Sequence, residues 1–352
     1  MQFLGELFIA FFSAYLALTN SLADGVESLF TQEDAVSEAS TLAKLSSAYE
    51  SIPQILLQNA AYQTGNVINS QATSTYVTDP VEALVNIFCT YTTDTYTRTT
   101  TGTGFFINPD GIILTNAHVA QFLLLETVEG STDCIIRTGN PATPTYKADL
   151  LYISPAWIQK YAALIDAPNP SGTGERDYAL LYVTAGLNNK PMPRYFPALA
   201  INTELISINA IGDPIHAAGY PAEELFASGD LNVDLIPVKV RTRIAELMTF
   251  GSNLADLMTI SGSPVGEQGS SGGPVLNTNG ETIGIISTKG DDEQFGSGSL
   301  RALTLSYVDR TIQEETGFTL DSYLGANLPY RSKLFKETLE PFLRGILEKE
   351  LE

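Results

Sequence analysis

Short apolar runs separated by turn residues occupy the chain from Val81 to about residue 312. They read VEALVNIFCTYT, GTGFFI, GIILTNAHVA, CIIRT, DYALLYVT, IHAAGYP, LIPVKVRTRI, GPVLNT, TIGIIST and ALTLSYV. Runs rich in Val, Ile, Thr, Tyr and Phe predict β-strands, and Asn-Pro-Asp-Gly at 108–111 and Asn-Thr-Asn-Gly at 277–280 predict hairpin turns. Because helical patterns do not alternate with these strands, the sequence predicts an all-β, antiparallel sandwich or barrel core, long enough for two barrels.

The segments on either side of this core have helical spacing. Residues 29–60 repeat apolar positions at helical intervals as far as Pro53, and residues 61–80 are polar. In the C-terminal segment, RSKLFKETLEPFLRGILEKELE predicts an amphipathic helix that is kinked or restarted at Pro341. We therefore predict a helical leader and linker at 24–80, a β-rich domain at 81–312 and a helical tail at 313–352.

The first 23 residues contain an apolar run from Leu7 to Leu18, followed by the small-residue end Ser-Leu-Ala. This length is typical of the apolar part of a signal peptide and is short for a membrane span. Glu6 and the lack of Lys or Arg before the run do not fit a signal peptide. We predict export, by a cleaved signal or a membrane anchor, and therefore a secreted, periplasmic or membrane-anchored protein. An apolar helix packed on the domain is the alternative.

Charge and side-chain chemistry narrow the function classes. The net charge of −21, from 40 acidic and 19 basic residues, argues against a nucleic-acid partner. Two cysteines and two histidines are too few for a typical zinc or iron–sulfur site, so we expect no metal and no cofactor. Cys89 and Cys134 form either one disulfide or two separate buried thiols, and the sequence leaves both open.

The stretch GEQGSSGGPV at 266–275 has few side chains that a core could use. Glycines allow tight turns in which neighbouring backbone N–H groups point into one space and bind a negatively charged oxygen. A serine at the edge of that space can attack the carbonyl group whose oxygen enters it. A plain Gly/Ser turn between strands is the alternative for this motif taken alone.

A nucleophilic serine needs a base, and the chain offers only His118 and His216. His118 follows the apolar strand GIILT, where it can project at a barrel mouth, whereas we expect His216 to be structural or exposed. A carboxylate must also orient the imidazole. Asp177 opens the apolar run DYALLYV, and Asp149 and Asp166 are its competitors.

The residues GTGFFINPDGIILTNAHVA, DYALLYV, GYP and GEQGSSGGPVLNTNGETIGIIS together resemble a trypsin-like (chymotrypsin-fold) serine protease. The pattern of these motifs most resembles that of bacterial HtrA/Deg-type proteases, although residues 313–352 are too few for their PDZ domain. The resemblance implies two six-stranded antiparallel β-barrels, with added N-terminal and C-terminal helices here, and an active site between them. It also implies His118 as base, Asp177 as orienting carboxylate and Ser271 as nucleophile, with the N–H groups of Gly269 and Ser271 as oxyanion hole.

The same resemblance implies a polypeptide substrate. Ser287, Thr288 and Lys289, in GIISTKG, correspond to the strand edge that pairs with substrate backbone. Val265 corresponds to the floor of the primary specificity pocket, which favours an apolar or small substrate side chain.

Three rival functions differ in testable features. GSSGG also satisfies the G-x-S-x-G elbow of α/β-hydrolases, but that fold places its histidine after the serine, and none follows Ser271. A catalytically inactive barrel that acts as an extracytoplasmic binding module would not need all three candidate residues. An anchored structural β-protein would not need glycines clustered around one serine.

Overall fold

The computed structural model describes residues 56–57, 76–92, 97–126, 132–165, 167, 172–228, 233–266 and 268–351. The predicted signal or anchor at 1–23 and most of the leader and linker at 24–80 lie outside these residues. Within the described ranges, no helix is both long enough and apolar enough to cross a membrane.

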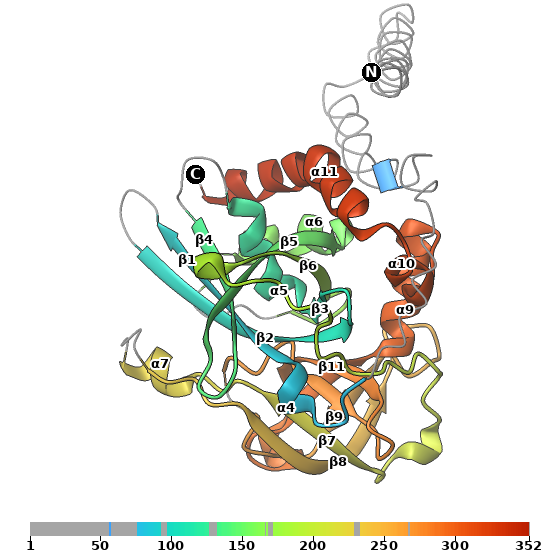
Figure 1. Ribbon diagram of the computed structural model, residues 1–352. Helices are drawn as coiled ribbons and strands as arrows, with labels where there is room; N and C mark the ends of the chain where they lie inside the picture. Colours follow the sequence, from blue (N-terminus) through green and yellow to red (C-terminus); the bar gives the residue numbers. More distant parts are fainter. Residues whose placement is uncertain are drawn as a thin grey trace, which may run out of the picture. The chain divides into compact units, whose positions relative to one another are not determined.

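The first barrel closes in the strand order β1-β2-β3-β6-β5-β4, and each neighbouring pair is antiparallel (Figure 1). Its strands are β1 (Leu84–Thr92), β2 (Thr97–Asn108), β3 (Ile112–Thr115), β4 (Thr132–Thr138), β5 (Thr143–Ile153) and β6 (Ala179–Gly186). The predicted turn at 108–111 joins β2 to β3, with Gly111 at φ +94° and the Asp110 N–H donating to Asn108 Oδ1 at 2.7 Å. All four residues of β3 are buried, so this strand ends inside the core.

The second barrel repeats this topology in the order β10-β11-β12-β9-β8-β7. Its strands are β7 (Pro214–Gly219), β8 (Val238–Met248), β9 (Leu257–Ile260), β10 (Pro274–Leu276), β11 (Thr282–Lys289) and β12 (Leu300–Thr304). The predicted turn at 277–280 joins β10 to β11 through the Gly280 N–H, which donates to Asn277 O at 3.1 Å. The two closed six-stranded barrels confirm the predicted fold class.

Short helical segments connect the strands. They are α4 (Pro80–Ala83), α5 (Ala117–Ala120), η1 (Gln121–Leu125), α6 (Pro155–Tyr161), η2 (Ala162–Leu164), η3 (Leu187–Asn189), η4 (Ile208–Ala210), α7 (Glu223–Ser228) and α8 (Asp292–Phe295). Most of them bridge strands within one barrel, whereas η3 and η4 lie in the chain that runs from β6 to β7.

Three helices follow β12: α9 (Leu305–Thr316), α10 (Leu320–Leu324) and α11 (Leu328–Leu351). The apolar run ALTLSYV was expected to be a strand throughout, but β12 ends at Thr304 and α9 begins at once. Thr304 Oγ1 accepts the N–H of Tyr307 at 3.2 Å and caps the helix, which outweighs the β-preference of the following residues.

Helix α11 continues through Pro341 without the restart that the sequence allowed. It packs on β5, η1 and α6 of the first barrel (Figure 1). The side chains of Phe335, Leu339, Leu343 and Leu347 are 0% exposed. Burial of this apolar face outweighs the hydrogen bond that proline removes.

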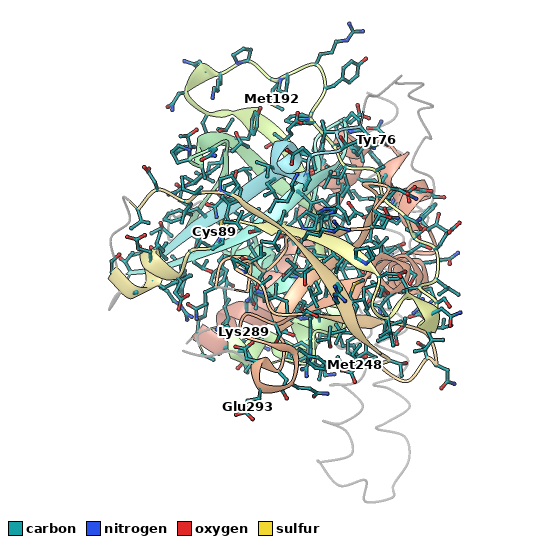
Figure 2. All side chains as sticks on the ribbon, turned by 90° about the horizontal axis from the view of Figure 1, so that it is seen from below. Tyr76, Cys89, Met192, Met248, Lys289 and Glu293 are labelled. Carbon is teal, nitrogen blue, oxygen red and sulfur yellow. A yellow bond between two sulfur atoms is a disulfide. The ribbon has the colours of Figure 1, made fainter. Side chains whose placement is uncertain are left out.

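The two cysteines form a disulfide. Cys89 in β1 (labelled in Figure 2) lies directly opposite Cys134 in β4, and their Cα atoms are 4.0 Å apart. The bond therefore joins two strands that are already paired in the first barrel.

If α11 is part of the hydrophobic core, Leu343→Ala should lower the free energy of unfolding by about 2–5 kcal/mol, because it leaves a cavity against the first barrel. Denaturant unfolding measures this loss. The matched variant is Leu205→Ala, at a side chain that is 57% exposed, and it should change stability far less. Equal effects of the two variants would contradict the packing.

Candidate active site

The three predicted catalytic residues come from separate parts of the chain. His118 lies in α5, immediately after β3, and Asp177 lies in the loop before β6. Both therefore belong to the first barrel. Ser271 lies in the glycine-rich loop before β10 of the second barrel.

The Asp177 side chain is 5% exposed, and its carboxylate is surrounded by hydrogen-bond donors. Its Oδ1 accepts the backbone N–H of His118 at 2.9 Å, and its Oδ2 lies 2.8 Å from Nδ1 of the same residue. Ser287 Oγ, from β11 of the second barrel, donates to Oδ2 at 2.7 Å. The Asn116 side chain donates to the backbone oxygen of Asp177 at 2.8 Å. Asp177 is thus held by groups from both barrels.

These contacts control the protonation of His118. Burial by itself lowers the pKa of the imidazole, but the charge of Asp177 and the hydrogen bond to it outweigh burial and raise the pKa above its ordinary value. The His118 side chain is still 33% exposed, so a ligand can reach it. An imidazole with Nδ1 directed to a carboxylate can exchange a proton at Nε2.

In the glycine-rich loop, two carbonyl groups are tied back into the protein. The Ala222 N–H donates to Gln268 O at 2.7 Å, and the Gly273 N–H donates to Ser270 O at 3.0 Å. In a trans peptide the N–H points away from the C=O. The N–H groups of Gly269 and Ser271 therefore point away from Ala222 and Gly273, the residues that bind the two carbonyl groups. No hydrogen bond among the described residues uses these two N–H groups. They remain available to a ligand oxygen.

Thr103 of β2, which the sequence reasoning missed, fixes this loop from the first barrel. Its hydroxyl accepts the Tyr220 N–H at 2.9 Å and donates to Gly269 O at 2.7 Å, and its N–H donates to Ser271 O at 2.8 Å. Thr103 is 0% exposed, and a Cβ at Gly272 would lie 1.9 Å from its backbone oxygen. In the sequence, the signal for this contact was the position of a polar residue, Thr103, within the apolar run GTGFFI.

The Ser271 hydroxyl donates to Ser287 O at 3.4 Å, a long hydrogen bond. Among the described side chains no hydrogen bond joins Ser271 to His118. Contacts between a nucleophile and its base are often long without substrate and shorten when substrate is bound.

The predicted substrate-binding residues lie in two different environments. The pairing of β10 with β11 begins at Pro274 and Ile285, so β10 does not cover Ser287–Lys289, and Lys289, labelled in Figure 2, is exposed. Val265 is instead 0% exposed and belongs to the core of the second barrel. Because its side chain is packed against apolar neighbours, the expectation that it contacts substrate does not fit this structure.

The competing residues lie elsewhere. His216 is on β7, opposite Leu276 and Arg241, and Asp149 on β5 pairs with Lys336 at 3.5 Å. Asp166 lies outside the described residues. In the part of the chain that the structure describes, no group of three or more His, Cys, Asp or Glu side chains could hold a metal ion.

Two closed six-stranded barrels define the chymotrypsin-like class of folds. The sequence matches the trypsin-like peptidase domain family over residues 102–285, slightly more than half of the chain, and the protein belongs to this family. Among solved structures, the active form of the Rv3671c protease from M. tuberculosis is similar, with 21% sequence identity and a TM-score of 0.41. The alignment covers 77% of this chain and 92% of that one. No curated protein has a significantly similar sequence.

The contact with Asp177 predicts that the His118 imidazole titrates above the ordinary histidine value of about 6.5. NMR of the ring protons can measure this, and a His216→Gln variant assigns the two histidines. Asp177→Asn should lower the midpoint, because it removes the charge that stabilises the protonated ring. An unchanged midpoint in Asp177→Asn would contradict the assignment.

Proposed function

We propose that the protein is a serine endopeptidase that hydrolyses peptide bonds through His118, Asp177 and Ser271. The observation that carries the proposal is the contact between the buried Asp177 carboxylate and His118 Nδ1. In the second barrel, the carbonyl groups of Gln268 and Ser270 are hydrogen-bonded within the protein, which leaves the N–H groups of Gly269 and Ser271 available to a ligand. Membership of the trypsin-like peptidase domain family supports it.

In the proposed mechanism, His118 takes the proton of the Ser271 hydroxyl as Oγ attacks the substrate carbonyl carbon. For this step the hydroxyl leaves its 3.4 Å contact with Ser287 O and donates to Nε2. Asp177 holds the ring in the required tautomer and stabilises the charge it acquires. Since the base must be unprotonated, activity rises with pH through the raised pKa of His118.

The negative oxygen of the tetrahedral intermediate accepts hydrogen bonds from the Gly269 and Ser271 N–H groups. His118 then donates its proton to the leaving amine, which leaves an acyl group on Ser271. Water, activated by His118, hydrolyses this acyl-enzyme and restores the hydroxyl. The substrate backbone pairs with the uncovered edge at Ser287–Lys289 as an added strand.

We also propose that the protein works in an extracytoplasmic compartment. The Cys89–Cys134 disulfide supports this, because disulfides persist mainly in oxidising environments.

Reaction with a fluorophosphonate probe tests the nucleophile. The wild-type protein should be labelled and should hydrolyse casein, whereas Ser271→Ala should do neither. Ser270→Ala is the matched control, because Ser270 Oγ is buried and has no hydrogen-bond partner among the described residues. An unlabelled wild-type protein, or equal labelling of Ser271→Ala, would favour an inactive barrel that acts as a binding module.

Substitution of Gly269 tests the oxyanion hole. A Cβ there would lie 2.6 Å from Ala222 Cβ and 2.7 Å from Tyr220 O, at φ +93°, so Gly269→Ala must displace its N–H. We expect kcat for a peptide substrate to fall about 10²- to 10³-fold. Gly212→Ala is the control, since Gly212 also has φ +93° but a Cβ there meets nothing within 4 Å. Equal kcat in the two variants would exclude the assigned role.

A further inference from the structure

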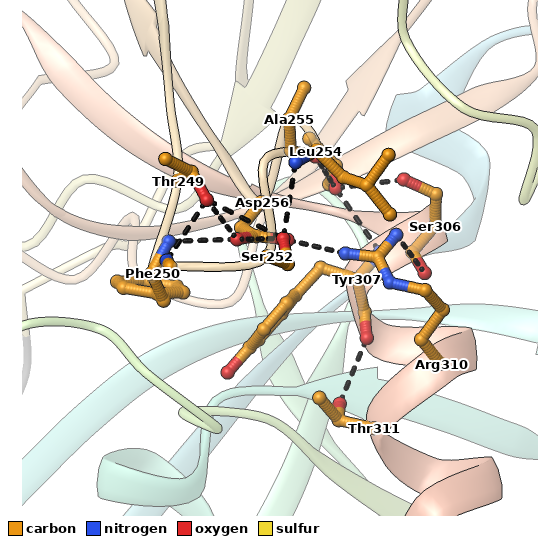
Figure 3. Close-up of polar contacts among 12 residues, drawn as sticks. Thr249, Phe250, Ser252, Leu254, Ala255, Asp256, Ser306, Tyr307, Arg310 and Thr311 are labelled. Atoms are coloured by element: carbon orange, nitrogen blue, oxygen red, sulfur yellow. Dashed lines mark hydrogen bonds and ion pairs between the residues drawn. The ribbon is translucent and has the colours of Figure 1, made fainter.

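The residues on both sides of Asp177 are held by helix α9, which lies outside the segment that matches the family. The Arg176 N–H donates to Tyr307 Oη at 3.1 Å, and Tyr178 Oη is hydrogen-bonded to Thr311 Oγ1 at 2.7 Å. Figure 3 shows Tyr307 and Thr311 one turn apart on this helix. One helix therefore contacts both neighbours of the carboxylate.

Arg176 has an unusual backbone conformation. Its φ of +56° lies in the left-handed region, which a residue with a Cβ adopts at a cost and keeps only where its surroundings fix it. Asp177 follows directly, so the conformation of Arg176 sets the direction in which the carboxylate leaves the loop.

The Arg176 side chain is fixed by two carboxylates of α9. Nη1 lies 2.8 Å from Glu315 Oε1, and Nη2 lies 2.9 Å from Glu314 Oε2. The two pairs differ in their environment, because the Glu314 side chain is 61% exposed and that of Glu315 is 6% exposed. Water weakens the first pair far more than the second.

Glu315 is itself held in one orientation by the first barrel. Tyr152 Oη donates to its Oε2 at 2.5 Å, and Ser154 Oγ donates to its Oε1 at 2.8 Å. The buried carboxylate thus has a partner for each oxygen in addition to Arg176. Loss of its charge would leave a partly buried guanidinium without its main counter-ion.

The same helix is anchored to the second barrel. Arg310 pairs with Asp256, which is 0% exposed and also accepts hydrogen bonds from Thr249 Oγ1 at 3.0 Å and from the Phe250 N–H at 2.7 Å (Figure 3). Phe250 in turn packs on the Tyr307 ring, with centroids 5.1 Å apart. Helix α9 therefore connects the barrel that carries Ser271 with the loop that carries Asp177.

We propose that α9 is a positioning element for the active site, in which the Glu315–Arg176 ion pair directs Asp177 toward His118. This inference rests on the proposed peptidase function and extends it to residues that touch no substrate. Glu315 and Arg176 act through Asp177 and are positioning residues.

The variants Glu315→Gln and Arg176→Met test the proposal. We expect kcat for a peptide substrate to fall about 10- to 100-fold, because small displacements of catalytic groups cost this much, while KM changes little. The midpoint of the rise of kcat/KM with pH should fall, since a displaced Asp177 no longer raises the pKa of His118. In the double variant kcat should fall about as far as in the more damaged single variant, because both substitutions break the same ion pair.

The controls separate positioning from folding. Glu337→Gln makes the same chemical change in α11, where Glu337 is 59% exposed and lies 3.7 Å from Lys333, and should leave kcat and the pH midpoint unchanged. Arg176→Lys keeps the positive charge and should recover part of kcat. Circular dichroism and Tm show which variants fold. If Glu315→Gln does not fold, Arg176→Gly replaces it as the test variant, because glycine adopts the left-handed conformation without strain.

Two outcomes distinguish this inference from the proposed function. Folded Arg176 and Glu315 variants with the wild-type kcat and pH midpoint would overturn the positioning role. A wild-type protein that a fluorophosphonate does not label would overturn the peptidase function instead. In that case NMR titration of His118 in Arg176→Met still tests the positioning of Asp177: a lowered midpoint supports it, and an unchanged midpoint overturns it.

Discussion

A carboxylate with almost no access to water needs hydrogen-bond partners, and this requirement organises the structure around Asp177. The partners of its carboxylate come from α5 in the first barrel and from β11 in the second. An unpaired charge at this depth would be costly. The two barrels must therefore meet in one arrangement for these donors to reach the Asp177 carboxylate together. The same arrangement places the glycine-rich loop against the first barrel, where Thr103 binds Gly269 O and Ser271 O.

The second constraint concerns backbone direction rather than charge. Around Ser271, amide groups face outward because the carbonyl groups of Gln268 and Ser270 are bound from behind, by Ala222 and Gly273. Thr103 links this loop to the first barrel with two hydrogen bonds, to Gly269 O and Ser271 O, and its hydroxyl also accepts the N–H of Tyr220. Helix α9 adds a further link, from Asp256 in the second barrel to Arg176 beside Asp177. Both links join a rigid barrel to a loop that has little regular structure of its own.

Sequence reasoning worked best where a local pattern carries the structure. The short apolar runs and the turns at 108–111 and 277–280 appear as expected, because strand and turn preferences depend on neighbouring residues. It was weaker where a helix cap or tertiary burial overrides a local preference. Thr304 caps α9 inside a run that looked like a strand, and α11 passes through Pro341 because its apolar face is buried on the first barrel. Val265, which was expected to line a pocket, is packed in a core.

The sequence by itself determined the fold class, the family and the candidates His118, Asp177 and Ser271, since their residue types and flanking runs are local features. Only the tertiary structure decided that Cys89 bonds to Cys134, that Ser287 donates to Asp177, that Thr103 donates to Gly269 O and that Glu315 pairs with Arg176. Thr103 and Gly269 are 166 positions apart, and Arg176 and Glu315 are 139 apart. Contacts over such separations leave no periodic trace in the chain, because they arise from how two barrels and a helix pack together.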